Sequence, residues 1–202
     1  MSRCYHNRES QVFFFYVICY NRMNIREGYM YCLKKSKGVR KMRTDIVVGI
    51  ADMKVIKGEG TIVTYALGSC VGICMYEEGS GLGGMVHAML PDSAHALALT
   101  SLEKYVDTGI DKLYRTLCHM GADRTRLRAK LIGGAKMFEY RTVADEVDIG
   151  TANVLQAKKL LRKLGVALVC EVTGGMVGRT IRFQPTTGKV MIQSTDQKVQ
   201  VI

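Results

Sequence analysis

The stretch from Thr61 to Pro91 constrains this chain most, and it reads TIVTYALGSCVGICMYEEGSGLGGMVHAMLP. Its first run, Ile62 to Leu67, is apolar and rich in β-branched residues, which predicts a buried strand. A second apolar run, Val71 to Tyr76, predicts another strand. Cys70 is therefore expected at a turn between two strands, where substrate can reach it and the sheet holds it still.

Two small residues, Gly68 and Ser69, stand directly before Cys70. A glycine lets backbone N–H groups approach a ligand closely. Such N–H groups are the usual donors to an oxygen that gains negative charge during a reaction. We therefore expect the backbone at Gly68 and Ser69 to form the substrate and oxyanion region beside Cys70.

His87 lies in a third run, Gly83 to Leu90. If this run pairs with the second strand across the turn at residues 77–82, Cys70 and His87 fall near the same end of the hairpin. A thiolate is a nucleophile, and a nearby histidine can accept the thiol proton. The same histidine can then protonate a leaving amine. The pair suits acyl transfer from an amide.

Other interpretations of these residues remain open from spacing alone. A buried cysteine is often a small apolar core residue, and a single histidine is often structural. Cys70, Cys74 and His87 could also bind a metal, but the Cys-x-x-x-Cys spacing is loose and no second Cys/His pair lies at zinc-finger distance. We expect neither a metal nor an organic cofactor. His95 lies on the following loop, where a solvent-facing role is favoured over a place in the site.

The segments ALGSCVGICMYE and GGMVHAMLP resemble the signature of the CheD family of receptor glutamine deamidases. The likeness covers roughly residues 45–192 and keeps the order of the family's motifs. It implies that Cys70 is the nucleophile, that His87 is the general base and acid, and that Thr64 helps to orient the histidine. Three further matches are KLIGGAKMF (residues 130–138), IGTAN (149–153) and GGMVGRTIRFQPTTGKV (174–190).

The chain departs from the family pattern at two places. Tyr65 and Ala66 stand where Leu-Gly is common, beside Thr64. Ala152 stands where an arginine often precedes the asparagine of the IGTAN segment, which is interpreted as a loop.

The resemblance also implies a reaction, a substrate and a partner. The reaction is hydrolysis of glutamine side-chain amides to glutamate through a thioester, with release of ammonia. The substrates are methyl-accepting chemoreceptors in the cytoplasm, and a further partner is the phosphatase CheC. Two alternatives stay open: a non-catalytic adaptor that binds the receptor or CheC, and another Cys-dependent amidase such as a peptidase or transglutaminase.

The formal net charge of +11 could suggest nucleic-acid binding, but the charge is unevenly placed. Residues 1–43 hold ten Lys and Arg against two acidic residues, whereas the remainder holds nineteen against sixteen. The main domain has no Lys/Arg stripe interleaved with aromatic residues, so no nucleic-acid partner is expected. The seven cysteines have no paired spacing, which favours free thiols in a reducing cytosol.

Residues 1–43 form a basic N-terminal extension around the apolar run Val12 to Tyr20. A signal peptide would fit the positive start, but no small-x-small cleavage site follows. A membrane-surface anchor is another interpretation. The favoured hypothesis is a misassigned start codon, with Met42 (or Met23 or Met30) as the true initiator, or else a poorly ordered extension. No stretch reaches the roughly 18 apolar residues needed to span a bilayer, so stable membrane insertion is not expected.

Residues 44–202 are predicted to form one domain with about eight strands and two main helices. The fold class is mixed α/β (α+β), a mainly antiparallel sheet sandwich with helices packed on its faces. The family resemblance implies a sandwich similar to bacterial toxin glutamine deamidases. Besides the hairpin, the predicted strands are at 46–55, 127–132 (ended by Gly133 and Gly134), 166–172, 179–183 and 190–192. The predicted helices are one after a capping box at 100–103 and one at 154–164. The mixed polar tail at 194–202 is expected either to fray or to pair with a partner.

Overall fold

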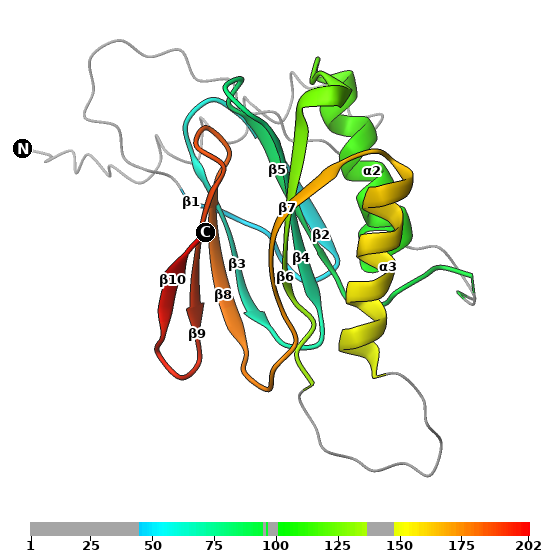
Figure 1. Ribbon diagram of the computed structural model, residues 1–202, viewed down its shortest axis with the longest axis vertical. Helices are drawn as coiled ribbons and strands as arrows, with labels where there is room; N and C mark the ends of the chain where they lie inside the picture. Colours follow the sequence, from blue (N-terminus) through cyan, green and yellow to red (C-terminus); the bar gives the residue numbers. More distant parts are fainter. Residues whose placement is uncertain (1–44, 95, 97–100, 137–147) are drawn as a thin grey trace, which may run out of the picture.

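The computed structural model describes residues 45–94, 96, 101–136 and 148–202. The hypotheses on residues 1–43 and on His95 lie outside these residues. In the described part of the chain, two five-stranded sheets and two α-helices stack in three layers (Figure 1). Helices α2 (Val106–His119) and α3 (Ile149–Lys163) cover one face of one sheet, whose other face packs on the second sheet. The predicted mixed α/β sandwich is confirmed, with both helices on the same side.

We call the sheet under the helices the helix-side sheet and the other the outer sheet. The helix-side sheet has the order β2 (Asp52–Lys57), β5 (Leu82–Ala88), β4 (Val71–Glu77), β6 (Leu127–Gly133) and β7 (Ala167–Thr173). The outer sheet has the order β1 (Asp45–Val47), β3 (Thr61–Leu67), β8 (Arg179–Gln184), β9 (Lys189–Ser194) and β10 (Val199–Val201). Two short 3₁₀ helices are η1 (Leu102–Lys104) and η2 (Arg124–Arg126).

The hairpin that carries Cys70 and His87 has the predicted register. Strands β4 and β5 pair antiparallel, with Val71 opposite Ala88 and Gly72 opposite His87. Cys70 directly precedes β4, so it lies at the end of the hairpin where His87 also lies. Both faces of β4 are buried, one under the helices and one against the outer sheet, which explains its unbroken apolar sequence.

Strands β3 and β4 lie in different sheets, which the sequence did not indicate. Residues 68–70 carry the chain from the outer sheet to the helix-side sheet. The step starts at an irregularity in the pairing of β3 with β8 between Thr64 and Leu67, where Ala66 has a φ of +56°. An L-residue adopts this left-handed conformation at a cost, which glycine avoids. Cys70 is therefore held at the junction of the two sheets rather than at an ordinary hairpin turn.

The single strand predicted at residues 46–55 is wrong. Strand β1 ends at Val47 in the outer sheet, and β2 begins at Asp52 in the helix-side sheet. Ala51, with a φ of +54°, lies in the turn between them. The apolar sequence does not reveal this change of sheet, because the segments before and after the turn both bury side chains in the core.

The predicted helix starts also need correction. Helix α2 begins at Val106 after Tyr105, which is extended and provides no side-chain cap. The Ser101 hydroxyl instead lies within hydrogen-bond distance of two acceptors, the Ala51 carbonyl (3.3 Å) and the Glu103 carboxylate (3.1 Å), and Thr100 lies outside the described residues. Helix α3 begins at Ile149, so the IGTAN segment is the start of a helix and not a loop. Its N-cap is Asp148, whose carboxylate accepts the N–H of Thr151.

The tail does not fray but pairs within its own chain. Strand β10 pairs antiparallel with β9, and the N–H and carbonyl groups of Val190 and Ile202 exchange two hydrogen bonds of 3.0 Å. The side chain of Ile202 packs on the core between the sheets. In the described residues, no helix is long and apolar enough to cross a membrane.

Candidate functional site

The loop of residues 68–70, which carries Cys70, is held by hydrogen bonds that other residues donate to its three carbonyl oxygens. One face of the loop lies against the turn after β6 and against helix α3. The three bonds are Ala135 N–H to the Gly68 carbonyl (2.8 Å), Asn153 Nδ2 to the Ser69 carbonyl (2.9 Å) and Gly134 N–H to the Cys70 carbonyl (2.8 Å). The loop is therefore anchored along one side.

The opposite side of this loop presents backbone N–H groups. In a trans, planar peptide the carbonyl and the N–H point in opposite directions. When the carbonyl is held toward the anchored side of the loop, the N–H of the same peptide points toward the opposite side. The N–H groups of Ser69 and Cys70 donate to no other residue in the described part of the chain. These two donors fit the predicted oxyanion region at Gly68 and Ser69.

Gly133 and Gly134 allow the close approach that anchors the loop. A Cβ atom at Gly133 would lie 2.3 Å from the Cys70 carbonyl oxygen, and one at Gly134 would lie 2.5 Å from Cγ2 of Val154. Both glycines also have positive φ angles, +111° and +64°. The pair therefore lets the backbone after β6 pack directly against the Cys70 loop.

His87 is buried in the core between the sheets and is hydrogen-bonded to Thr64. Its Nδ1 atom lies 2.8 Å from Thr64 Oγ1, and the Thr64 hydroxyl donates to the carbonyl of Val48 at 2.8 Å. A hydroxyl has one proton, and Thr64 donates it to the Val48 carbonyl. The second hydrogen bond of Oγ1 must therefore be donated by the N–H at Nδ1 of His87. This assigns the tautomer with an unprotonated Nε2. Nε2 has no partner among the described residues, which leaves its lone pair available to a proton donor.

Burial controls the charge of both reactive groups. It lowers the pKa of His87 to about 4, although the nearby Asp52 carboxylate acts in the opposite direction. Burial also raises the pKa of the Cys70 thiol, against the effect of its own N–H. At neutral pH the site therefore holds a neutral thiol and a neutral imidazole.

The structure joins two of the three predicted catalytic residues directly. Thr64 and His87 are hydrogen-bonded, and Cys70 lies at their end of the hairpin because Gly72, two residues further on, pairs with His87. The Cys70 thiol and His87 Nε2 are not hydrogen-bonded to one another. Catalytic hydrogen bonds often tighten only when substrate binds, so this geometry is compatible with proton transfer between them.

Two residues near the site were not predicted from the sequence. Asn153 is fully buried on α3 and donates both Nδ2 protons, one to the Ser69 carbonyl and one to the Met89 carbonyl. Arg179 on β8 is 8% exposed and donates to the carbonyls of Gly133 and Gly174. Burial lowers the pKa of its guanidinium. Both lie in quoted motifs, but the sequence did not show what they contact.

The alternative metal site is not assembled here. Cys74 is fully buried on β4 opposite Met85, four residues along the strand from Cys70. A strand rises about 3.3 Å per residue, so the two sulfur atoms belong to different parts of the core. Within residues 45–94, 96, 101–136 and 148–202, no group of three or more His, Cys, Asp and Glu residues could hold a metal.

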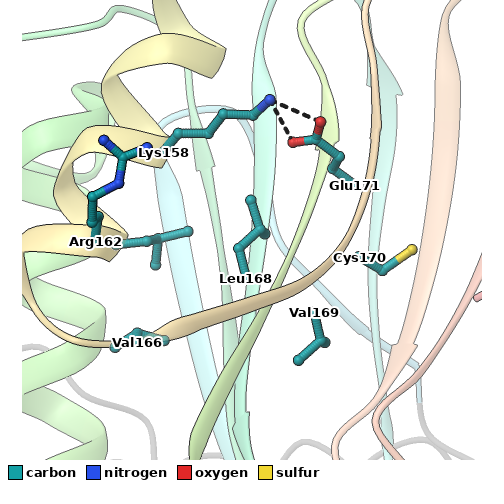
Figure 2. A pocket seen from close by; sticks show the side chains of 8 residues that line it. Lys158, Arg162, Val166, Leu168, Val169, Cys170 and Glu171 are labelled. Atoms are coloured by element: carbon teal, nitrogen blue, oxygen red, sulfur yellow. Dashed lines mark hydrogen bonds and ion pairs between the residues drawn. The ribbon is translucent and has the colours of Figure 1, made fainter.

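An open groove of about 530 Å³ lies between α3 and the edge strand β7 (Figure 2). Lys158 and Glu171 form an ion pair of 2.8 Å across it. Its other lining residues are Leu161, Arg162, Val166, Leu168, Val169 and Cys170. The groove contains none of the predicted catalytic residues.

Comparison with known proteins gives consistent matches. The family model for CheD, described as chemotactic sensory transduction, matches residues 89–194. "Probable chemoreceptor glutamine deamidase CheD" from Pyrococcus abyssi is 49% identical over 152 residues, which cover 75% of this chain and 93% of that protein. "Chemoreceptor glutamine deamidase CheD" from Bacillus licheniformis is 39% identical over 169 residues, 82% of this chain and 99% of that protein.

Solved structures give a weaker match. The crystal structure of the Bacillus licheniformis hypothetical protein YfiH aligns with a TM-score of 0.43 and 13% sequence identity. The alignment covers 62% of this chain and 51% of that one.

Proposed function

Since this chain belongs to the CheD family, we infer that it is a chemoreceptor glutamine deamidase that acts through Cys70 and His87. One observation of the site supports this most strongly. The hydrogen bonds from His87 Nδ1 to Thr64 and from Thr64 to Val48 leave Nε2 unprotonated, buried and at the Cys70 end of the hairpin. A general base for a thiol needs this tautomer in this place.

The first half of the reaction forms a thioester. His87 Nε2 takes the thiol proton as Cys70 Sγ attacks the carbon of the glutamine side-chain amide. The amide oxygen gains negative charge and accepts hydrogen bonds from the N–H groups of Ser69 and Cys70, each typically worth about 10²–10³ in rate. The protonated His87 then gives its proton to the amide nitrogen, and the C–N bond breaks to release ammonia.

The second half restores the enzyme. A water molecule loses a proton to His87 as its oxygen attacks the thioester carbon. The same two N–H groups stabilise the second tetrahedral intermediate. The C–S bond breaks, and the proton on His87 returns to the sulfur of Cys70. The product is a glutamate side chain in place of the glutamine.

The family resemblance supports three further proposals about context. The modified glutamines lie on the cytoplasmic helices of methyl-accepting chemoreceptors, the phosphatase CheC binds this chain and couples deamidation to adaptation, and the reaction takes place in the cytoplasm. A reducing compartment fits the free thiols of the described residues, Cys70, Cys74, Cys118 and Cys170.

Product analysis on the cytoplasmic fragment of a chemoreceptor tests this function. One ammonia for each new glutamate, with the fragment uncut, is the expected result. A cut chain would indicate a peptidase, and an amine cross-link would indicate a transglutaminase. Binding of the fragment or of CheC without ammonia release would support the adaptor alternative.

Replacing Thr64 by valine should lower kcat by about 10- to 100-fold, the size of effect seen when a metal-binding histidine loses the group that hydrogen-bonds to its other ring nitrogen and orients it. Valine has nearly the same shape but no oxygen to accept the Nδ1–H of His87. Thr64→Ser keeps the hydroxyl and is the matched control, expected to retain most activity. Steady-state kinetics of ammonia release measure both. Equal activity of Thr64→Val and the wild type would show that this hydrogen bond does not orient the base.

The pH dependence of kcat/KM should reflect the lowered pKa of His87. Protonated His87 cannot accept the thiol proton, so activity falls as the pH falls through about 4 and is level from there to neutral pH. A histidine of ordinary pKa would instead lose activity below about 6.5. Ammonia release measured from pH 3.5 to 8, with circular dichroism to verify folding, separates the two. An acid limb centred near 6.5 would contradict the proposed burial effect.

A further inference from the structure

Asn153 connects the two halves of the catalytic hairpin to one helix. It lies in the first turns of α3 and is 0% exposed. Its Nδ2 group donates to the Ser69 carbonyl and to the Met89 carbonyl, each at 2.9 Å. Ser69 directly precedes the nucleophile, and Met89 follows the general base by two residues. A single amide therefore contacts the backbone of both segments.

The hydrogen bond from Asn153 to the Ser69 carbonyl fixes the direction of the proposed oxyanion donor, the Cys70 N–H. The Ser69 carbonyl and the Cys70 N–H belong to the same planar, trans peptide and point in opposite directions. With the carbonyl held toward α3, the N–H of the same peptide points away from the helix, toward the open side of the Cys70 loop. Without Asn153 the two neighbouring carbonyls would still be held by Ala135 and Gly134, but this peptide could rotate.

The two bonds that Asn153 donates also stabilise the fold, but its own buried acceptor offsets part of that contribution. Its Oδ1 atom is buried and has no hydrogen-bond partner among the described residues. An unpaired buried acceptor is destabilising and offsets part of what the two donated bonds contribute. Rotating the amide by half a turn would place Oδ1 against two carbonyl oxygens, so the observed orientation is the one that forms hydrogen bonds.

We propose that Asn153 is a positioning residue for the deamidation, which orients the Cys70 N–H as an oxyanion donor through the Ser69 carbonyl. This inference rests on the proposed function and adds a residue to it. Asn153 acts through the Cys70 N–H, which stabilises charge that develops only in the transition state, so its effect is on the rate of the chemical step rather than on substrate binding.

Asn153→Leu removes the donor and keeps a side chain of similar size. We expect kcat to fall by about 10²-fold or more, the effect of one oxyanion donor, with KM nearly unchanged.

Alkylation of Cys70 by iodoacetamide should keep its wild-type rate, since that displacement develops no oxyanion. Leu161→Ala, which removes a buried apolar side chain from the same helix, is the matched control. It should lower Tm and leave kcat near the wild-type value.

Asn153→Asp gives a readout that a purely structural role would not produce. An ionised carboxylate would face two carbonyl oxygens, whereas the protonated acid has one O–H to donate. The variant should be nearly inactive at pH 7–8 and regain activity as the pH is lowered toward 5. The wild type should stay level over this range, because the pKa of His87 is about 4.

Each outcome decides between clear alternatives. An active wild type beside an equally active Asn153→Leu would overturn this inference alone. So would a parallel loss of alkylation and deamidation, because it would show a general collapse of the site. If Asn153→Leu does not fold, the absence of acid recovery in Asn153→Asp overturns the inference. No ammonia from folded wild-type protein would instead contradict the proposed function, and with it this inference.

Discussion

Replacing Cys70 with alanine is expected to abolish ammonia release from a chemoreceptor fragment, a loss on the order of 10⁴-fold or more. The thiol supplies the atom that bonds to the substrate carbon, so His87 has nothing to activate in its absence. Cys70 is only half-buried, and the loop around it is anchored through backbone carbonyls, which the substitution leaves in place. The variant should therefore fold normally, with a Tm close to that of the wild type.

Cys74→Ala is the matched control for this experiment. It removes the same thiol group from the same strand region, but from a fully buried position in the core between the sheets. We expect Cys74→Ala to lower Tm and to retain kcat/KM, the reverse of the pattern for Cys70→Ala. Residual turnover of more than a few per cent in Cys70→Ala would show that another group is the nucleophile.

Replacing His87 with asparagine is expected to lower kcat/KM by about 10²–10⁴-fold, the usual contribution of one acid–base group. The amide of asparagine can occupy the place of Nδ1 and still donate to Thr64, but it has no counterpart of Nε2. This variant therefore separates the base from the hydrogen bond that orients it. Ammonia release and the rate of Cys70 alkylation should both fall, since both need the thiol to lose its proton.

The pH profile provides the control for His87→Asn. The acid limb centred near 4 in the wild type should disappear from the variant, because the group that titrates there has been removed. A variant that loses less than tenfold, or that keeps the acid limb, would assign the role of base to another residue.

The catalytic hairpin could be predicted because its signals are local. Two apolar runs and the short turn between them place Cys70 and His87 at the same end of a hairpin, and the observed register pairs His87 with Gly72. The roles proposed for Cys70 and His87 rest on their chemistry and on the family resemblance. The hydrogen bond of Thr64 to His87 agrees with the role that the resemblance implied for Thr64.

Other features could not be predicted because they depend on contacts between distant residues. Asn153 and Ser69 are 84 residues apart in sequence, and no local pattern reports a hydrogen bond of that span. The breaks at Ala51 and Ala66, where the chain changes sheets, are also hidden, because apolar residues on both sides bury themselves in one core. The start of α3 was missed because Gly150 and Thr151 weaken its helical pattern, although Asp148 caps it.

Acid-quenched mass measurement of the enzyme during turnover tests the central claim most directly. The protein is mixed with a glutamine-bearing receptor peptide, quenched at short times, and its intact mass is measured before proteolytic mapping. We predict an adduct on Cys70 with the mass of the peptide less ammonia, which is absent from Cys70→Ala. Formation of glutamate with Cys70 unmodified at every quench time, and at an equal rate in Cys70→Ala, would contradict the account.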